Sequence, residues 1–242
     1  IIYTTTIFKK KHMLFISNKK QIIENYFSFL LAFIPISFIA GNLIINLNVI
    51  LIILSTIIIY GKNVFRIPYL FLDKCIFIFF LLILFTAFFN DIYFLISELY
   101  PSGYHTIFKS FLFLKYLLLY LSLRFLIEKR IINLKYFFLS CFSCSLFVCF
   151  DIFYQFIFGK DIFGFEIIGA GRRLSGPFGD ELIAGGYLQR FSIFSFFLLP
   201  LFYIKYSNKF SKFLIPILFI IFITFLILSG NRMPTILFIF VI

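Results

Sequence analysis

The chain has 242 residues, of which 62% are hydrophobic and 13% charged, and this composition excludes a water-soluble domain built around one apolar core. The formal net charge is +12, but no basic patch is interleaved with exposed aromatic residues, so we expect no nucleic-acid partner. Lipid offers the backbone no hydrogen-bond partners, and helices satisfy these groups internally. We therefore predict an all-α protein, a polytopic helical transmembrane bundle that contacts membrane lipids.

Apolar windows long enough to cross about 30 Å of hydrocarbon as helices follow one another along the chain. We expect seven complete spans and a truncated eighth that begins at Pro234. The complete spans are placed at 22–41, 43–60, 70–89, 107–127, 136–158, 187–204 and 213–229. Connections are short and no internal repeat is found, which favours a single membrane domain over 1–242. Because the first residue is Ile and the eighth window stops at Ile242, we expect a fragment that lacks material at both ends.

The distribution of basic residues predicts the orientation. Most of the 22 Lys and Arg residues lie in alternate connections, beginning with the N-terminal segment, and basic loops favour the cytoplasmic side. We therefore place the N-terminus in the cytoplasm. The loop at 159–186 and the turn at 229–234 then both lie on the outer face.

The fifth window has a polar face. Ser140, Cys144, Asp151 and Gln155 share one side of a helix, and Asp151 lies about 12 Å inside the window at 1.5 Å per residue. A charge at that depth is costly and needs a partner, and Lys115 lies at a similar depth in the fourth window. We hypothesise that Lys115 and Asp151 pair or share a polar cavity; the alternative is that each extends separately to the interface.

The loop at 159–186 gathers glycines and charges that the rest of the chain avoids. Arg172 and Arg173 precede a Gly-rich stretch that leads into Gly185, where the sixth window opens. Arginine forks suit phosphate oxygens, glycine allows close backbone approach, and a helix N-terminus attracts anions. These features predict an anion site.

Other charged residues accompany this predicted site. Arg232 stands in the second outer turn, so two arginine-bearing turns would suit a ligand with two phosphates; the alternative is that these arginines are interfacial anchors. Asp180 and Glu181 are candidates for acid or base chemistry, against a solvated or Arg-paired structural role. Arg190 adds a further basic residue on the same side. No His, Cys, Asp and Glu spacing suits a metal, and the CxxC at Cys141 lies in apolar helix.

Three ordered motifs, at 151–164, 173–181 and 228–232, together resemble the bacterial O-antigen ligase and O-antigen polymerase family over the second half of the chain. The resemblance implies a multi-pass enzyme of the bacterial inner membrane, with its site on the periplasmic face. Its donor would be an undecaprenyl-diphosphate-linked glycan. The acceptor would be lipid A core for a ligase or a growing glycan for a polymerase. Transfer would be metal-independent and inverting and would need no cofactor.

The resemblance also implies roles for individual residues. Arg173, or Arg172 in its place, and Arg232 would hold the diphosphate, and positioned arginines would stabilise the charge that builds on it as it leaves. Family members carry a later periplasmic histidine thought to activate the acceptor, and neither His12 nor His105 matches it. We therefore expect that histidine beyond Ile242 and expect the 242 residues to be inactive alone.

A function from another class remains open. A transporter or flippase of lipid-linked oligosaccharide or polysaccharide would also bind an anionic lipid. Such a protein should show paired broken helices or inverted repeats with polar residues near the bilayer midplane. The charges of this chain are instead concentrated at the predicted outer rim, which favours chemistry on one face.

Overall fold

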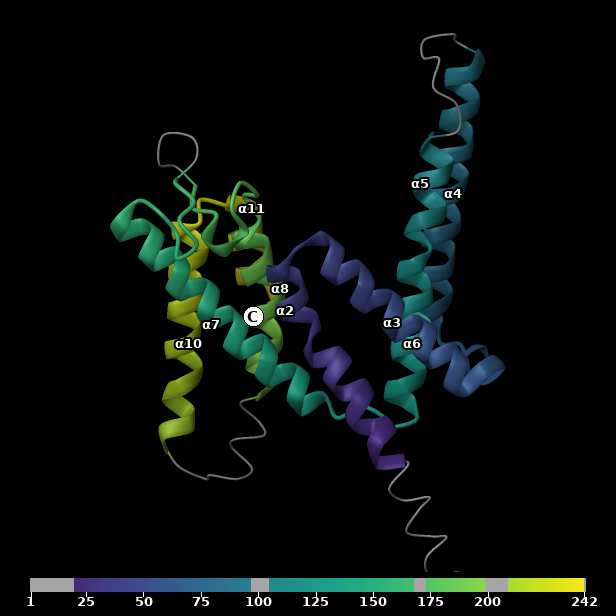
Figure 1. Cartoon of the computed structure of the whole chain (residues 1–242), viewed down its shortest axis with the longest axis horizontal. Helices are drawn as coiled ribbons and strands as arrows, with labels where there is room; N and C mark the ends of the chain where they lie inside the picture. Colours follow the sequence, from purple (N-terminus) through teal and green to yellow (C-terminus); the bar gives the residue numbers. More distant parts are fainter. Residues whose placement is uncertain (1–19, 97–104, 168–172, 199–208, 242) are drawn as a thin grey trace, which may run out of the picture. The chain divides into compact units, whose positions relative to one another are not determined.

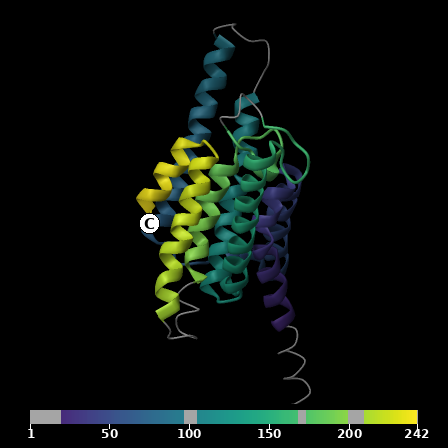
Figure 2. The same cartoon turned by 90° about the vertical axis from the view of Figure 1, so that its left-hand side faces the viewer.

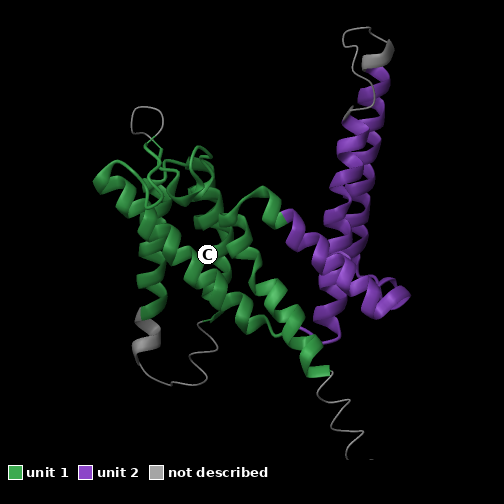
Figure 3. Cartoon of the chain, in the orientation of Figure 1, with its two compact units in different colours: residues 1–45, 133–242 green, residues 46–132 purple. Residues whose placement is uncertain are grey.

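The computed structural model describes residues 20–96, 105–167, 173–198 and 209–241, coloured along the chain in Figure 1. Within these residues the secondary structure is helical, and one isolated antiparallel bridge joins Lys160 and Glu166. The predicted all-α class is confirmed. The chain divides into two compact units, Ile1–Ile45 with Asn133–Ile242 (unit 1) and Asn46–Ile132 (unit 2), coloured separately in Figure 3. The single membrane domain over 1–242 stays a prediction, and each unit is described by itself.

Four described helices are long and apolar enough to cross a membrane. They are Asn42–Phe65, which contains α3 (Asn42–Tyr60) and η1 (Gly61–Phe65), Phe71–Tyr93 within α4 (Phe71–Ile96), Thr106–Glu128, and α7 (Leu134–Phe158). A bent pair, Lys20–Ala32 with α2 (Ile34–Ala40), would make a fifth. These helices indicate a membrane protein.

The predicted seven complete spans and a truncated eighth are not confirmed. The expected sixth span at 187–204 corresponds to α8 (Ala184–Phe196), which has 13 residues and at 1.5 Å per residue is about 20 Å long. Residues 199–208 lie outside the described part of the chain. The apolar stretch Leu214–Leu228, within the 20-residue α10 (Lys209–Leu228), and α11 (Arg232–Val241) are shorter than the four candidate spans.

The first predicted span is broken by a 41° bend between Lys20–Ala32 and α2. Pro35 lies in the first turn of α2, where its missing N–H and its ring interrupt continuation of the preceding helix. The hydroxyl of Tyr187 on α8 donates to the Pro35 carbonyl at 3.0 Å. The bend is thus tied to the packed part of unit 1.

Helix α8 is the centre of unit 1, where it packs against α7, α10 and α11 (Figure 2). One continuous cluster of buried side chains joins these four helices. It includes Ile152 of α7, Leu188 of α8, Phe222 of α10 and Phe238 of α11, each fully buried. Leu174, from the loop before α8, completes the same cluster. This packing positions both arginine-bearing segments.

Unit 2 is built around α4, which packs against α5 (His105–Phe113) and α6 (Lys115–Glu128). At the start of α4 the buried Asp73 accepts hydrogen bonds from the backbone N–H of Leu70, at 2.6 Å, and from the hydroxyl of Tyr120. Its carboxylate also lies 3.0 Å from Nε of Arg124. An acidic residue at the third position of a helix that accepts from the N–H of the residue before the helix caps the N-terminus of that helix. Asp73 therefore caps α4 and also joins its start to α6.

The two ion pairs of Arg124 provide a stability test. Asp73→Asn should lower the melting temperature of the detergent-solubilised protein, because a buried carboxylate with three partners loses its charge. Glu128→Gln, the matched control, should leave the melting temperature unchanged, because Glu128 is partly exposed and lies 4.0 Å from Arg124. Equal melting temperatures for the two variants would show that the Asp73 network does not hold α4 to α6.

Candidate functional site

The chain turns back sharply where α7 ends. Gly159 adopts φ 74° and ends the helix, a left-handed conformation that glycine tolerates without a steric cost. The backbone N–H of Ile167 then donates to the Gly159 carbonyl at 3.2 Å, and that of Asp161 donates to the Phe165 carbonyl at 2.9 Å. Residues 159–167 therefore form a compact hairpin at the end of α7, which we call the α7 hairpin.

Asp151, near the end of α7, holds the α7 hairpin by a hydrogen bond to its backbone. Its side chain is fully buried, and its Oδ1 accepts a hydrogen bond from the backbone N–H of Ile162 at 2.8 Å. Asp161, also buried, accepts a hydrogen bond from the backbone N–H of Phe165 at 2.7 Å and directly precedes Ile162 in the chain. The second oxygen of each carboxylate accepts no hydrogen bond from the described residues. Asp151 near the end of α7 and Asp161 in the α7 hairpin are thus two neighbouring buried carboxylates.

Gln155, one turn beyond Asp151, holds the second segment of the loop. Its Oε1 accepts from the backbone N–H of Gly176 at 2.9 Å, and its Nε2 donates to Ser175 Oγ at 3.3 Å, with all three residues buried. Gly176 has φ 56°, and a Cβ there would lie 3.2 Å from Cγ1 of Ile152. The polar face predicted for α7 therefore serves to hold the backbone of the loop close to the helix.

The loop before α8 also contacts the turn between α10 and α11. Asn231 Nδ2 donates to the Leu182 carbonyl at 3.3 Å. A Cβ added at Gly185 would lie 2.6 Å from Cβ of Asn231 and 2.7 Å from Oγ of Ser229. Only a glycine permits this approach. The contact brings the segment that directly follows the second motif against the third motif, at one end of unit 1 (Figure 1).

The two arginine-bearing segments present exposed charges at this end. Arg173 lies just before the buried turn, and Arg232 is the first residue of α11; both are exposed. Arg190, in the second turn of α8, is exposed too. In the described part of the chain none of the three guanidinium groups pairs with a carboxylate. Positive charge is therefore available to an anion at this end.

Other predicted site residues have separate positions. Asp180 and Glu181 are exposed between η2 (Gly176–Phe178) and α8, and neither forms an ion pair with a described residue. Arg172 lies outside the described residues. The structure thus describes two of the three arginines predicted to hold the diphosphate.

Lys115 belongs to unit 2, whereas Asp151 belongs to unit 1. Lys115 Nζ donates to Oδ1 of Asn46 at 2.5 Å and lies 5.1 Å from the ring centroid of Tyr116. Each of the two predicted partners thus has a hydrogen-bond partner within its own unit. The ion pair between Lys115 and Asp151 stays a prediction.

Several residues that shape the arginine-bearing end of unit 1 were not predicted. Asp161 lies between Gly159 and Gly164, a spacing typical of a turn, but its burial depends on how the α7 hairpin folds. The contact of Gly185 with Asn231 has no signal in the sequence, because the two residues are far apart along the chain. In the described residues no group of three or more His, Cys, Asp or Glu could hold a metal ion.

Comparison of the chain with models of protein families, with curated proteins and with solved structures finds no match. The resemblance to O-antigen ligases and polymerases therefore stays a prediction from the three sequence motifs.

Two adjacent glycines test the contact between the loop and the α10–α11 turn. Gly185→Ala should destabilise the protein by about 1–3 kcal/mol, because its methyl group would overlap Asn231 and Ser229. Gly186→Ala is the matched control, since no atom lies within 4 Å of its added Cβ. It should be neutral or stabilise α8 by up to about 1 kcal/mol. Unfolding of both variants in detergent measures the difference, and equal stability would contradict the close approach.

Variants of two glutamines test whether the hydrogen bonds from α7 keep the loop in place. Gln155→Leu should cost about 1–3 kcal/mol, because the buried N–H of Gly176 would lose its acceptor. Gln189→Leu on α8 replaces a partly buried glutamine that has no side-chain hydrogen bond to a described residue, and it should change stability little. Limited proteolysis between residues 159 and 186 should be faster in Gln155→Leu alone. Unchanged cleavage there would show that Gln155 does not hold the loop.

Proposed function

We propose that this protein is an O-antigen ligase- or polymerase-like glycan transferase of the bacterial inner membrane. Its donor is a glycan linked to undecaprenyl diphosphate, and its acceptor is lipid A core or a growing glycan. The observation that carries the proposal is the joining of the two arginine-bearing segments. Asn231 bonds to Leu182 and packs on Gly185, so Arg173 and Arg232 stand at the same end of unit 1, both exposed.

The chemistry of the proposed transfer needs such charges. An acceptor hydroxyl oxygen bonds to the anomeric carbon while the bond from that carbon to the diphosphate oxygen breaks. The lipid diphosphate leaves with the electron pair, and the hydroxyl proton passes to a base. Negative charge therefore builds on the leaving group, where preorganised arginines stabilise it most. Arg173 and Arg232 would bind the diphosphate oxygens through paired N–H donors.

The buried face of α7 supports this role without touching the ligand. Asp151 and Gln155 hold the two halves of the loop by hydrogen bonds to backbone N–H groups. A site that stabilises developing charge must keep its donors in place before the reaction. We assign Asp151 and Gln155 as positioning residues. Asp180 and Glu181, exposed on the same loop, are carboxylates available for proton transfer.

We propose that this end of unit 1 faces the periplasm. The basic residues of the chain support that orientation, because most of them lie in connections of the opposite set. Lys135, at the other end of α7, belongs to that set.

One observation favours a transporter of lipid-linked glycan as a second candidate. The helix pair Lys20–Ala32 and α2 is bent by 41°, and transporters build substrate sites from broken helices. In this chain the bend carries no charged side chain, and Tyr187 caps the Pro35 carbonyl. The exposed arginines lie at the end of the helices rather than at the bend, which favours the transferase.

Arginine variants of the full-length protein test the transferase. Arg173→Ala and Arg232→Ala should each lower transfer by about 100-fold or more, because each removes a donor to the developing charge. Lysine at either position should restore transfer only in part, since it lacks the paired donors. Glycan transfer is measured in proteoliposomes that contain an undecaprenyl-diphosphate-linked oligosaccharide and a purified acceptor.

Lys135→Ala, at the opposite end of α7, is the matched control and should transfer glycan normally. Full activity of both arginine variants would refute the diphosphate role. Movement of the intact donor across the vesicle, without a covalent product, would favour the transporter instead.

A further inference from the structure

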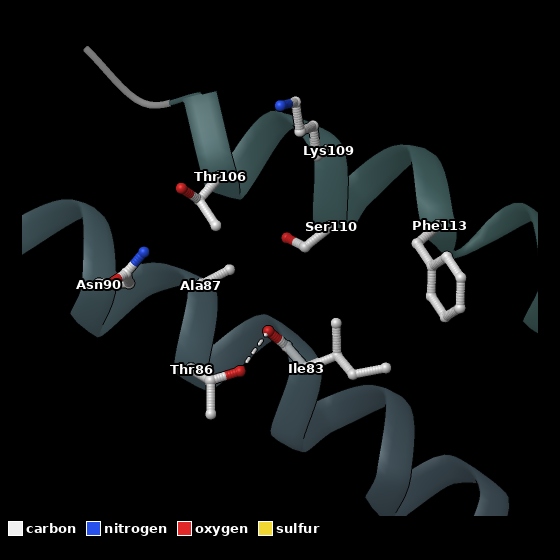
Figure 4. A pocket seen from close by; sticks show the side chains of 8 residues that line it. All are labelled: Ile83, Thr86, Ala87, Asn90, Thr106, Lys109, Ser110 and Phe113. Atoms are coloured by element: carbon white, nitrogen blue, oxygen red, sulfur yellow. Dashed lines mark hydrogen bonds between the residues drawn. The ribbon is translucent and has the colours of Figure 1, made fainter. Parts of the chain in front are cut away.

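A pocket of about 540 Å³ lies between α4 and α5, and all its lining residues belong to unit 2. Figure 4 shows the residues that line it on the two helices: Thr106, Ser110 and Phe113 lie on the side of α5 toward α4, and the Lys109 ammonium extends away from α4 at the rim. Asn90, Thr106 and Lys109 supply polar groups, and Ile83, Ala87 and Phe113 supply apolar surface. A volume of this size is typical of sites for small molecules.

The polar and apolar groups are separated along the helices. Asn90 lies near the end of the candidate span Phe71–Tyr93, and Thr106 begins the span Thr106–Glu128. Ile83 and Phe113 each lie seven residues from these polar residues, about 10 Å deeper at 1.5 Å per residue. The pocket is therefore polar at the end of the spans and apolar toward their interior, as an amphiphile would require.

The two hydroxyl groups in the middle of the pocket already donate hydrogen bonds to backbone carbonyls. Thr86 Oγ1 donates to the carbonyl oxygens of Leu82 and Ile83, at 2.9 and 3.0 Å, and Ser110 Oγ donates to Ile107 at 2.7 Å. These side chains therefore contribute mainly apolar surface to a ligand. The groups left for a polar head are at the span end, as Figure 4 shows for Asn90 and Thr106.

The charge at that end is positive. The exposed ammonium group of Lys109 forms no ion pair within the described residues, and no carboxylate lines the pocket. The nearby Asp91 is buried, and its two oxygens accept from the backbone N–H groups of Thr106 and Ile107, at 3.3 and 2.9 Å. Asp91 thus caps the start of α5, and Lys109 is the charge that a headgroup would meet.

We propose that this pocket binds a phospholipid with an anionic headgroup. The Lys109 ammonium pairs with the phosphate, and Asn90 and Thr106 donate hydrogen bonds to its oxygens. One acyl chain lies against Ile83, Ala87 and Phe113. A free phosphate ion would leave that apolar surface uncovered, so the depth of the pocket favours a lipid. This binding does not depend on glycan transfer, because it uses residues of unit 2 alone.

Lipid retention by the purified full-length protein tests this site. The protein in detergent is incubated with equal amounts of phosphatidylglycerol and phosphatidylcholine of the same acyl chains, and bound lipid is measured by native mass spectrometry. The wild-type protein should prefer phosphatidylglycerol, and Lys109→Gln should lose about fivefold of that preference. Lys109→Arg should keep it.

Lys129→Gln is the matched control, because Lys129 is exposed at the far end of α6 in the same unit. Ala87→Leu, which fills the pocket, should lower retention of both lipids, with the melting temperature recorded to verify folding. Equal retention of the two lipids by the wild type, or equal losses in Lys109→Gln and Lys129→Gln, would overturn the proposal. Preference for a short polyprenyl diphosphate over phosphatidylglycerol, or retention of inorganic phosphate alone, would also overturn it.

Discussion

The fold of the loop between α7 and α8 depends on buried side chains that accept hydrogen bonds from buried backbone N–H groups. Packed helices exclude water, so an N–H group that leaves regular helix geometry must find an acceptor in the protein. Asp151 accepts from Ile162, and Gln155 accepts from Gly176. Both acceptors lie on one face of α7, one helical turn apart. Without them the loop would have to move outward to hydrate its backbone.

This constraint connects the core to the proposed chemistry. Because α7 holds the loop, Leu174 can pack into the apolar cluster while its neighbour Arg173 stays exposed. The absence of a side chain at Gly185 then admits Asn231, and Arg232 follows directly. The arginines that we propose to bind the diphosphate are thus carried on packed segments. That is the arrangement expected of preorganised electrostatic stabilisation.

The polar interactions of unit 2 follow the same rule with different partners. Asp73 joins the start of α4 to Tyr120 and Arg124, and Asp91 caps α5 from the neighbouring helix. Within unit 2, Lys115 donates a hydrogen bond to Asn46, 69 residues away along the chain. Depth in a span can be estimated from helical rise, but which side chain stands opposite depends on how the helices pack.

Composition by itself determined the helical membrane class, because a backbone in lipid must satisfy its own hydrogen bonds. Helical periodicity placed Asp151 and Gln155 on one face, since that relation is local to α7. The number of spans did not follow in the same way, because apolar windows do not locate the bend before Pro35 or the end of α8. Tertiary structure alone decided the burial of Asp161 and the hydrogen bond from Gly176 to Gln155. It also decided the hydrogen bond between Asn231 and Leu182, which are 49 residues apart. Such contacts join distant segments through packing, and no local pattern of residues encodes them.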